Sequence, residues 1–138
     1  MTSFIDIPTG PAALRVLIVQ SDAALGADWA RHLEGQGLAV TLAATADAAL
    51  KALRRRDFHA IILDMVLSDG NALIVADIAA FRQPGASVIC VTDDSFFSDG
   101  SIFNHCATAR LMLERGTPPE ELAAIVSHYG ARSTTPVR

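Results

Sequence analysis

The chain has 138 residues, a length typical of one domain that buries roughly 70% of its unfolded surface. Half of the residues (51%) are hydrophobic and 19% are charged, which excludes a largely disordered chain. The net charge of −4 argues against nucleic-acid binding, and neither a signal peptide nor an apolar run of about 18 residues is present, so we expect a cytoplasmic protein without membrane contact.

Five short apolar runs predict the strands of a sheet. Most of them are apolar on both faces, as strands are when helices cover both sides of a sheet. They alternate with segments in which apolar residues recur every three or four positions, which is typical of βαβ units and a parallel sheet. The predicted strands are 16–19, 39–43, 60–63, 88–91 and 111–113.

Five helices are expected between and after these strands. Local chemistry marks most of their ends: a capping Thr, a Pro in a first turn, or a Gly that stops the helix. The basic run 54–56 is expected to end the second helix, at the negative end of its dipole. The helices are expected over 24–36 with a stop at Gly37, after Thr45, over 71–81, near Ser101 in a short segment, and from Thr117 to a stop at Gly130. Residues 1–13 and 131–138 are expected as tails around one domain at 14–130.

Polar residues follow four of the predicted strands. In an open parallel sheet, ligands and chemistry gather beyond the carboxyl ends of the strands. We therefore expect these side chains to meet at one edge of the sheet. They are Gln20, Ser21 and Asp22 after the first strand, Asp64 after the third, Thr92 and Asp93 after the fourth, and Arg115 after the fifth.

Three segments carry a resemblance to a known family: FHAIILDMVLSDGNAL (58–73), SVICVTD (87–93) and RGTPPEELAAIV (115–126). Together they resemble the receiver domain of bacterial two-component response regulators, over about residues 14 to 130. The resemblance implies a flavodoxin-like three-layer α/β sandwich whose parallel five-stranded sheet has the strand order 2-1-3-4-5. Since no output domain follows the matched region, it implies a stand-alone receiver.

The resemblance also implies roles for individual residues. Asp64 takes the place of the aspartate that accepts a phosphoryl group from a phosphohistidine, and such self-catalysed transfer is the most enzymatic activity that we expect. Thr92 takes the place of the hydroxyl that hydrogen-bonds the phosphoryl group. Arg115 stands where the family has lysine, Gly116 and Ser68 stand where it has proline, and Met112 stands where it has the switch aromatic.

The largest departure from the family follows the first strand. Receivers place two acids there to hold Mg²⁺, and this chain has Gln20 and Ser21. Because Mg²⁺ is generally held by one or two carboxylates and water, we expect poor metal affinity with Asp64 as the one matched acid. Two interpretations of Asp22 and Asp93 stay open: they rebuild a metal site, or Asp22 caps the first helix and Asp93 begins a turn.

Arg115 also has two interpretations. Its guanidinium can clamp the carboxylate of Asp64 in a two-pronged pair, or it is a surface cation. Other sites have little support. The four histidines are scattered, which disfavours zinc or copper, and no glycine-rich or Ser/Thr-rich phosphate loop follows the first strand, which disfavours nucleotide and flavin cofactors.

Three functional hypotheses follow. The first is an atypical receiver that acts through protein contacts, with Mg-dependent phosphorylation impaired or absent. The second is a genuine phosphorelay receiver phosphorylated on Asp64 by a histidine kinase, and the third is a small flavodoxin-like ligand binder. The family implies a kinase, phosphotransferase or downstream target, or a second copy, docking on the face of the fourth helix, fifth strand and fifth helix. On that face Phe96, Phe97, Ile102 and Phe103 either anchor a partner or complete the core.

Overall fold

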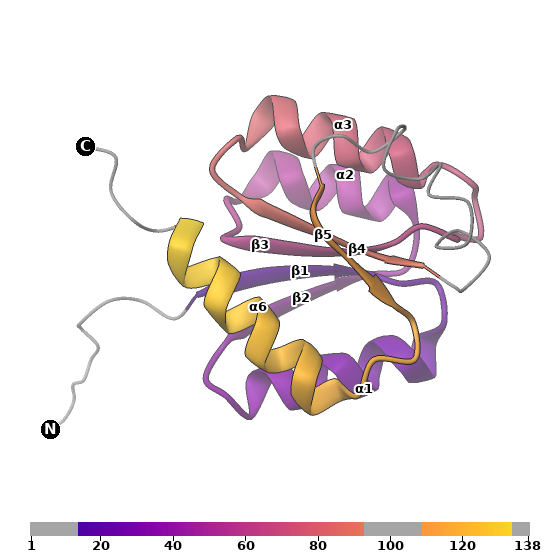
Figure 1. Cartoon of the computed structure of the whole chain (residues 1–138). Coiled ribbons are helices and arrows are strands. Elements are labelled where there is room, and N and C mark those ends of the chain that lie inside the picture. The colour runs from indigo at the N-terminus through magenta and orange to yellow at the C-terminus, as the bar shows by residue number, and fades with distance from the viewer. Residues whose placement is uncertain (1–13, 93–108, 134–138) are drawn as a thin grey trace, which may run out of the picture.

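The computed structural model describes residues 14–92 and 109–133 (Figure 1). Its five strands form one parallel sheet with the order β2-β1-β3-β4-β5, as the resemblance implies. Each predicted strand is present, and four are longer than expected at one or both ends. The strands are β1 (Arg15–Val19), β2 (Ala39–Ala43), β3 (Ala60–Asp64), β4 (Ser87–Thr92) and β5 (Ala109–Glu114).

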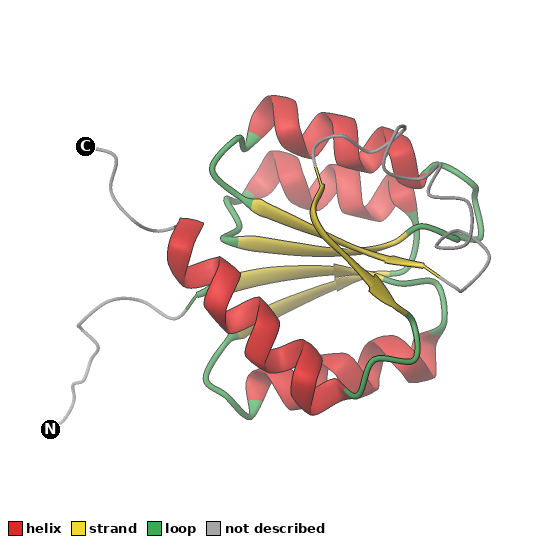
Figure 2. Ribbon diagram, viewed as in Figure 1, coloured by secondary structure: helices red, strands yellow, loops and turns green. Residues whose placement is uncertain are grey.

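Helices cover both faces of the sheet, which makes three layers (Figure 2). Helices α2 (Ala46–Arg55) and α3 (Ala72–Arg82) pack together on one face. Helices α1 (Ala23–Glu34) and α6 (Pro119–Ser133) pack together on the other. Because both faces are covered, β3 and β4 are buried along their whole length, which explains their continuous apolar runs.

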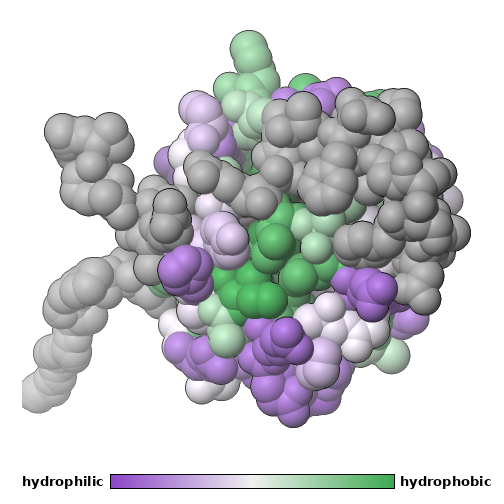
Figure 3. Space-filling view, in the orientation of Figure 1, coloured by the Kyte–Doolittle hydropathy of each residue, from purple (hydrophilic) through white to green (hydrophobic). Residues whose placement is uncertain are grey.

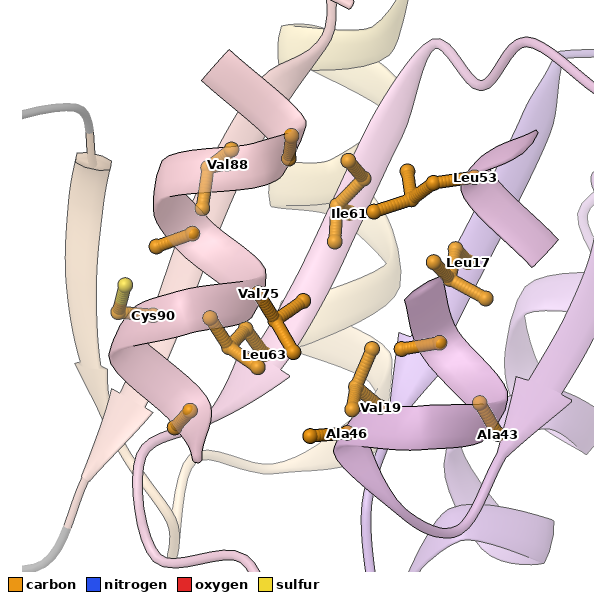
Figure 4. Close-up of a cluster of buried hydrophobic side chains, with 14 of the residues drawn as sticks. Leu17, Val19, Ala43, Ala46, Leu53, Ile61, Leu63, Val75, Val88 and Cys90 are labelled. Carbon is orange, nitrogen blue, oxygen red and sulfur yellow. The ribbon is translucent and has the colours of Figure 1, made fainter. Parts of the chain in front are cut away.

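The core consists of two clusters, one on each face of the sheet. Alternate residues of β1 supply both: Leu17 and Val19 face α2 and α3, while Val16 and Ile18 face α1 and α6. Figure 4 shows the first cluster, where side chains of β1 and β3 meet those of α2 and α3. Met112, at the position of the family's switch aromatic, is buried at the margin of this cluster.

Local capping positions the helices largely as predicted. The Asp22 carboxylate accepts a hydrogen bond from the Leu25 N–H (3.1 Å), and the Thr45 hydroxyl accepts one from the Ala48 N–H (3.1 Å). Gly37 follows α1 with a φ of +87°, in the left-handed region expected of it. Arg54 and Arg55 lie in the last turn of α2, as predicted.

Both ends of α6 differ from expectation. The first helical bond runs from the Leu122 N–H to the Pro118 carbonyl, so the helix begins after Pro118 and not directly after Thr117. The helix also continues through Gly130 to Ser133, so the predicted stop is wrong. A Cβ at Gly130 would lie 3.3 Å from the Leu14 side chain, so this glycine allows close packing of α6 and does not end it.

The expected short helix near Ser101 lies outside the described residues, as do Asp93, Phe96, Phe97, Ile102 and Phe103. Among the helices that the structure describes, none has the length and apolar character needed to cross a membrane.

Candidate functional site

The carboxyl ends of the strands bring the predicted polar residues to one edge of the sheet. Gln20 follows β1, Asp64 and Thr92 are the last residues of β3 and β4, and Arg115 follows β5. Gln20 and Arg115 both contact Asp64, although 44 and 51 residues respectively separate them from it in sequence.

Asp64 is completely buried, and its carboxylate accepts four hydrogen bonds. Oδ1 accepts from the Val66 backbone N–H (2.8 Å) and from Arg115 (2.7 Å). Oδ2 accepts from the Gln20 amide (2.6 Å) and from Arg115 Nε (2.9 Å). A carboxylate offers about four acceptor positions, so this group is saturated by protein donors.

Arg115 provides the two-pronged contact that the sequence allowed as one alternative. Its Nε and one terminal nitrogen each bind a different oxygen of Asp64, while its backbone N–H donates to the Thr92 carbonyl (2.7 Å). The Arg115 side chain is 36% exposed, so the guanidinium contacts the buried carboxylate on one side and solvent on the other. The interpretation of Arg115 as a surface cation is therefore wrong, and the pair supplies the positive charge that a buried carboxylate requires.

Gln20 explains the unusual end of the first strand. The side chain is 3% exposed, donates to Asp64, and accepts from the Asp22 N–H through its carbonyl oxygen (2.9 Å). A carboxylate at this position has no proton to donate and would repel Asp64. The neutral amide thus fits the metal-free pairing of Asp64 with Arg115.

Ser21 connects three loops of the same edge. Its hydroxyl donates to the Ala44 carbonyl (2.8 Å) and accepts from the Ser68 N–H (2.9 Å), and it lies 3.1 Å from the Ser68 hydroxyl. These contacts tie together the loops after β1, β2 and β3. Ser68, which stands where the family has proline, makes the contacts from the loop after β3.

Asp69 is a residue that sequence reasoning missed. Its carboxylate accepts from the Ala46 N–H (3.1 Å), so a side chain of the β3–α3 loop binds the first turn of α2. A local signal existed, because Asp69 precedes Gly70, which has a φ of +76° as expected of an Asp-Gly turn. No local sequence pattern indicates that Asp69 accepts a hydrogen bond from Ala46, 23 positions earlier in the chain.

Asp22 acts as the cap of α1, which confirms one of its two interpretations. Thr92 is fully buried at the end of β4, on the predicted edge, and its role toward a phosphoryl group stays a prediction.

The residues at this edge do not fit Mg²⁺. The single acid at a family position, Asp64, has both oxygens bound to donors, one of which is a cationic guanidinium that would repel a divalent ion. The Ser21 hydroxyl and the Gln20 carbonyl oxygen are bound within the protein as well. Within residues 14–92 and 109–133, no three His, Cys, Asp or Glu side chains group as metal ligands.

A hollow of about 400 Å³ lies over this network at the surface. Its walls come from the loops after β1 and β3 together with Arg115. The half-exposed guanidinium is therefore the part of the Asp64 network that solvent reaches most readily, while Asp64 lies beneath it.

No protein-family model and no curated protein sequence matches the chain. Solved structures do match it. A CheY-like response regulator receiver domain protein from Methanospirillum hungatei is 25% identical, with 88% of this chain and 97% of that chain covered and a TM-score of 0.79.

Two further structures have the same fold at lower identity. An adenylate cyclase from Rhodopirellula baltica is 17% identical, with 88% and 90% of the two chains covered and a TM-score of 0.78. A response regulator protein from Burkholderia pseudomallei, with a phosphorylated aspartic acid, calcium ion and citrate, is 21% identical, with 88% and 71% covered and a TM-score of 0.74. Strand order, helix placement and these neighbours agree, and the chain has the CheY-like fold of a response regulator receiver domain.

Proposed function

We propose that this protein is an atypical signalling receiver that acts through protein contacts, with Mg-dependent phosphorylation of Asp64 impaired or absent. One observation carries the proposal: the Asp64 carboxylate is buried and accepts four hydrogen bonds, two of them from Arg115. An oxygen that attacks a phosphoryl group needs a free lone pair aimed at phosphorus, and here each oxygen already binds two donors.

The charge balance supports the same conclusion. In phosphoryl transfer, metal ions bridge phosphate oxygens and neutralise the charge that gathers on them. Within the described part of this site, Arg115 supplies the positive charge, and the buried Asp64 carboxylate already uses it. A phosphoryl group that recruits Arg115 would leave a buried anion without its counter-charge, which is costly.

Phosphorylation of purified protein tests the proposal. The chain is incubated with a small acyl phosphate donor and MgCl₂, and intact mass is measured for four forms: unchanged, Asp64→Asn, the triple variant Gln20→Asp/Ser21→Asp/Arg115→Lys, and that triple variant with Asp64→Asn. We expect no adduct on the unchanged chain, and an adduct on the triple variant that Asp64→Asn removes.

A phosphoryl adduct on the unchanged chain that the Asp64→Asn variant lacks would contradict the proposal. It would establish instead the genuine phosphorelay receiver, which the retained acid at the end of β3 and the hydroxyl of Thr92 favour. The Burkholderia pseudomallei neighbour carries a phosphorylated aspartic acid in this fold.

For protein contacts, we propose the face formed by β5 and α6. Figure 3 shows apolar surface at the centre of this side of the molecule, with hydrophilic residues below it. Leu111, Leu113, Ile125 and Tyr129 are only partly buried there. Light scattering on the unchanged chain and on Ile125→Glu tests a homodimer through this face: the variant should shift a dimer to monomer, and circular dichroism checks that the variant is folded.

A further inference from the structure

The outer edge of β2 carries backbone groups that no described strand pairs. Within the described part of the chain, β2 pairs with β1 alone. The Ala39 N–H donates to the Leu14 carbonyl and the Ala43 carbonyl accepts from the Gln20 N–H, so residues 39, 41 and 43 direct their backbone groups toward β1. By alternation, the N–H and carbonyl groups of Val40 and Leu42 point away from the sheet, where an added strand would bind them.

The α2 side of this edge is hollowed and cationic. A groove of about 330 Å³ runs between β2 and α2. Residues 41–43 of β2, the small side chains of Ala48 and Ala52, and three long, exposed basic side chains line it. The three basic residues are Lys51, Arg55 and Arg56.

The positive charge is concentrated here although the whole chain is acidic. Lys51, Arg54, Arg55 and Arg56 are four of its 11 basic residues, while the net charge is −4. The arginines at the end of α2 complement its dipole. Of these four cations only Lys51 forms an ion pair with a described carboxylate, that of Asp47 at 3.2 Å on the same helix.

The α1 side of the same edge is apolar. Leu42 is 47% exposed, and its Cδ1 lies against α1, where a Cβ built on Gly26 would be 3.3 Å away. The two sides of the β2 edge therefore differ: cations line the side toward α2, and exposed apolar surface lies on the side toward α1.

We propose that the β2 edge binds an extended acidic segment of a partner protein, which adds to the sheet as a strand next to β2. Side chains of a strand alternate between the two faces. Every second residue of the segment is thus acidic and reaches Lys51 and Arg55, and the residues between them are apolar and cover Leu42. This mode of recognition joins backbone pairing, which provides affinity, to alternate side-chain contacts, which provide specificity. It is independent of the chemistry at Asp64.

Fluorescence anisotropy with a short labelled peptide of alternating valine and glutamate tests this surface. We expect saturable binding to the full chain, weakened about tenfold by Lys51→Gln/Arg55→Gln, because two ion pairs are lost. Arg82→Gln removes a cation of α3 that is also exposed, and it should leave the affinity unchanged. Circular dichroism confirms that each variant is folded.

Two modified probes separate strand addition from general charge attraction. Methylation of alternate peptide amides should abolish binding when the methyl groups lie on the edge that faces β2, and should have no effect when they lie on the other edge. A peptide of alternating valine and lysine should not bind. Equal binding of both methylated peptides would overturn the proposal. So would a loss of peptide affinity in the Arg82→Gln variant as large as that in Lys51→Gln/Arg55→Gln. Displacement of the peptide by single-stranded DNA would also overturn it.

Discussion

Asp64 and Arg115 differ in exposure, and this difference decides what each contributes to stability. The carboxylate is fully buried, whereas the guanidinium is 36% exposed. A cation that loses its partner here can turn toward water, but the carboxylate cannot. The cost of breaking the pair therefore comes mainly from the buried anion.

We predict that Arg115→Ala lowers the free energy of unfolding by about 2–3 kcal/mol, because it leaves the buried carboxylate without a cation. Adding Asp64→Asn to this variant should recover about 1 kcal/mol, since a neutral amide needs no counter-charge. Urea denaturation measures both, and Arg82→Ala serves as the control with an exposed cation. A double variant less stable than Arg115→Ala alone would show that the buried charge is not the source of the loss.

His59 lies at the amino end of β3, and we expect it to make the stability of the fold depend on pH. Burial lowers the pKa of His59 from its ordinary value of 6.5, and the nearby positive charge of Arg15 lowers it further. The ring also lies where its Nδ1 accepts the Arg15 backbone N–H (2.8 Å), a bond that requires an unprotonated nitrogen. The folded protein therefore favours neutral His59.

The unfolded chain binds a proton at His59 at higher pH than the folded chain does. Stability from this residue is thus fully present above pH 6.5 and decreases as the pH falls below that value toward the lowered pKa. We predict that His59→Gln reduces the loss of stability between pH 7 and pH 5, measured by urea denaturation across about this range. An unchanged pH profile in the variant would contradict the assignment, and the exposed His128→Gln variant is its control.

At the scale of elements, Gln83 joins the end of α3 to the connection between α2 and β3. Its amide donates to the Leu53 carbonyl (3.0 Å) and the Arg56 carbonyl (2.8 Å), and its oxygen accepts from the Phe58 N–H (2.7 Å). The three backbone groups lie in the last turn of α2 and in the connection that follows it. A single buried side chain thereby satisfies backbone groups that no strand or helix pairs.

We predict that Gln83→Ala lowers the free energy of unfolding by about 2–3 kcal/mol, because it leaves buried donors and acceptors without partners. Gln83→Glu should also destabilise, since it keeps the acceptor and loses both donated bonds. Gln36→Ala at an exposed turn is the comparison, with an expected change within about 0.5 kcal/mol. Similar thermal or urea midpoints for Gln83→Ala and Gln36→Ala would show that water replaces the amide without cost.

The elements themselves were predictable because their causes are local. Apolar runs, Thr45 and Asp22 as caps, and the left-handed Gly37 each act within a few residues. Gly130 was misjudged for the opposite reason. Whether a glycine stops a helix or permits close packing depends on what lies beside it, here Leu14, more than a hundred positions earlier in the chain.

For the whole molecule, hydrogen bonds within the protein connect the loops at the functional edge. Ser21 links the loops after β1, β2 and β3, Asp69 binds the first turn of α2, and Gln20 and Arg115 hold Asp64. Hydrogen bonds between the protein's own groups therefore organise this edge.

We predict that neither millimolar MgCl₂ nor a chelator, each added alone, changes the melting temperature. A ligand stabilises a fold only when it binds the native state, and we expect no Mg²⁺ to bind at this edge. In the triple variant Gln20→Asp/Ser21→Asp/Arg115→Lys, three carboxylates would gather at this edge, and MgCl₂ should raise the melting temperature. Differential scanning calorimetry measures both, with CaCl₂ and NaCl as ionic controls. A rise in the unchanged chain with MgCl₂ but not NaCl would contradict the assignment of a metal-free edge.

The sequence by itself determined the fold class, the strands, most helix ends and which strand ends carry Gln20, Asp64, Thr92 and Arg115, because periodicity, capping and parallel strand direction are local or topological properties. Only the tertiary structure decided how those side chains combine. Arg115 as a clamp, Gln20 as a donor to Asp64 and Asp69 as an acceptor for Ala46 are contacts across 23 to 51 residues. Their strength depends on distance, direction and burial, which arise only when the chain has packed.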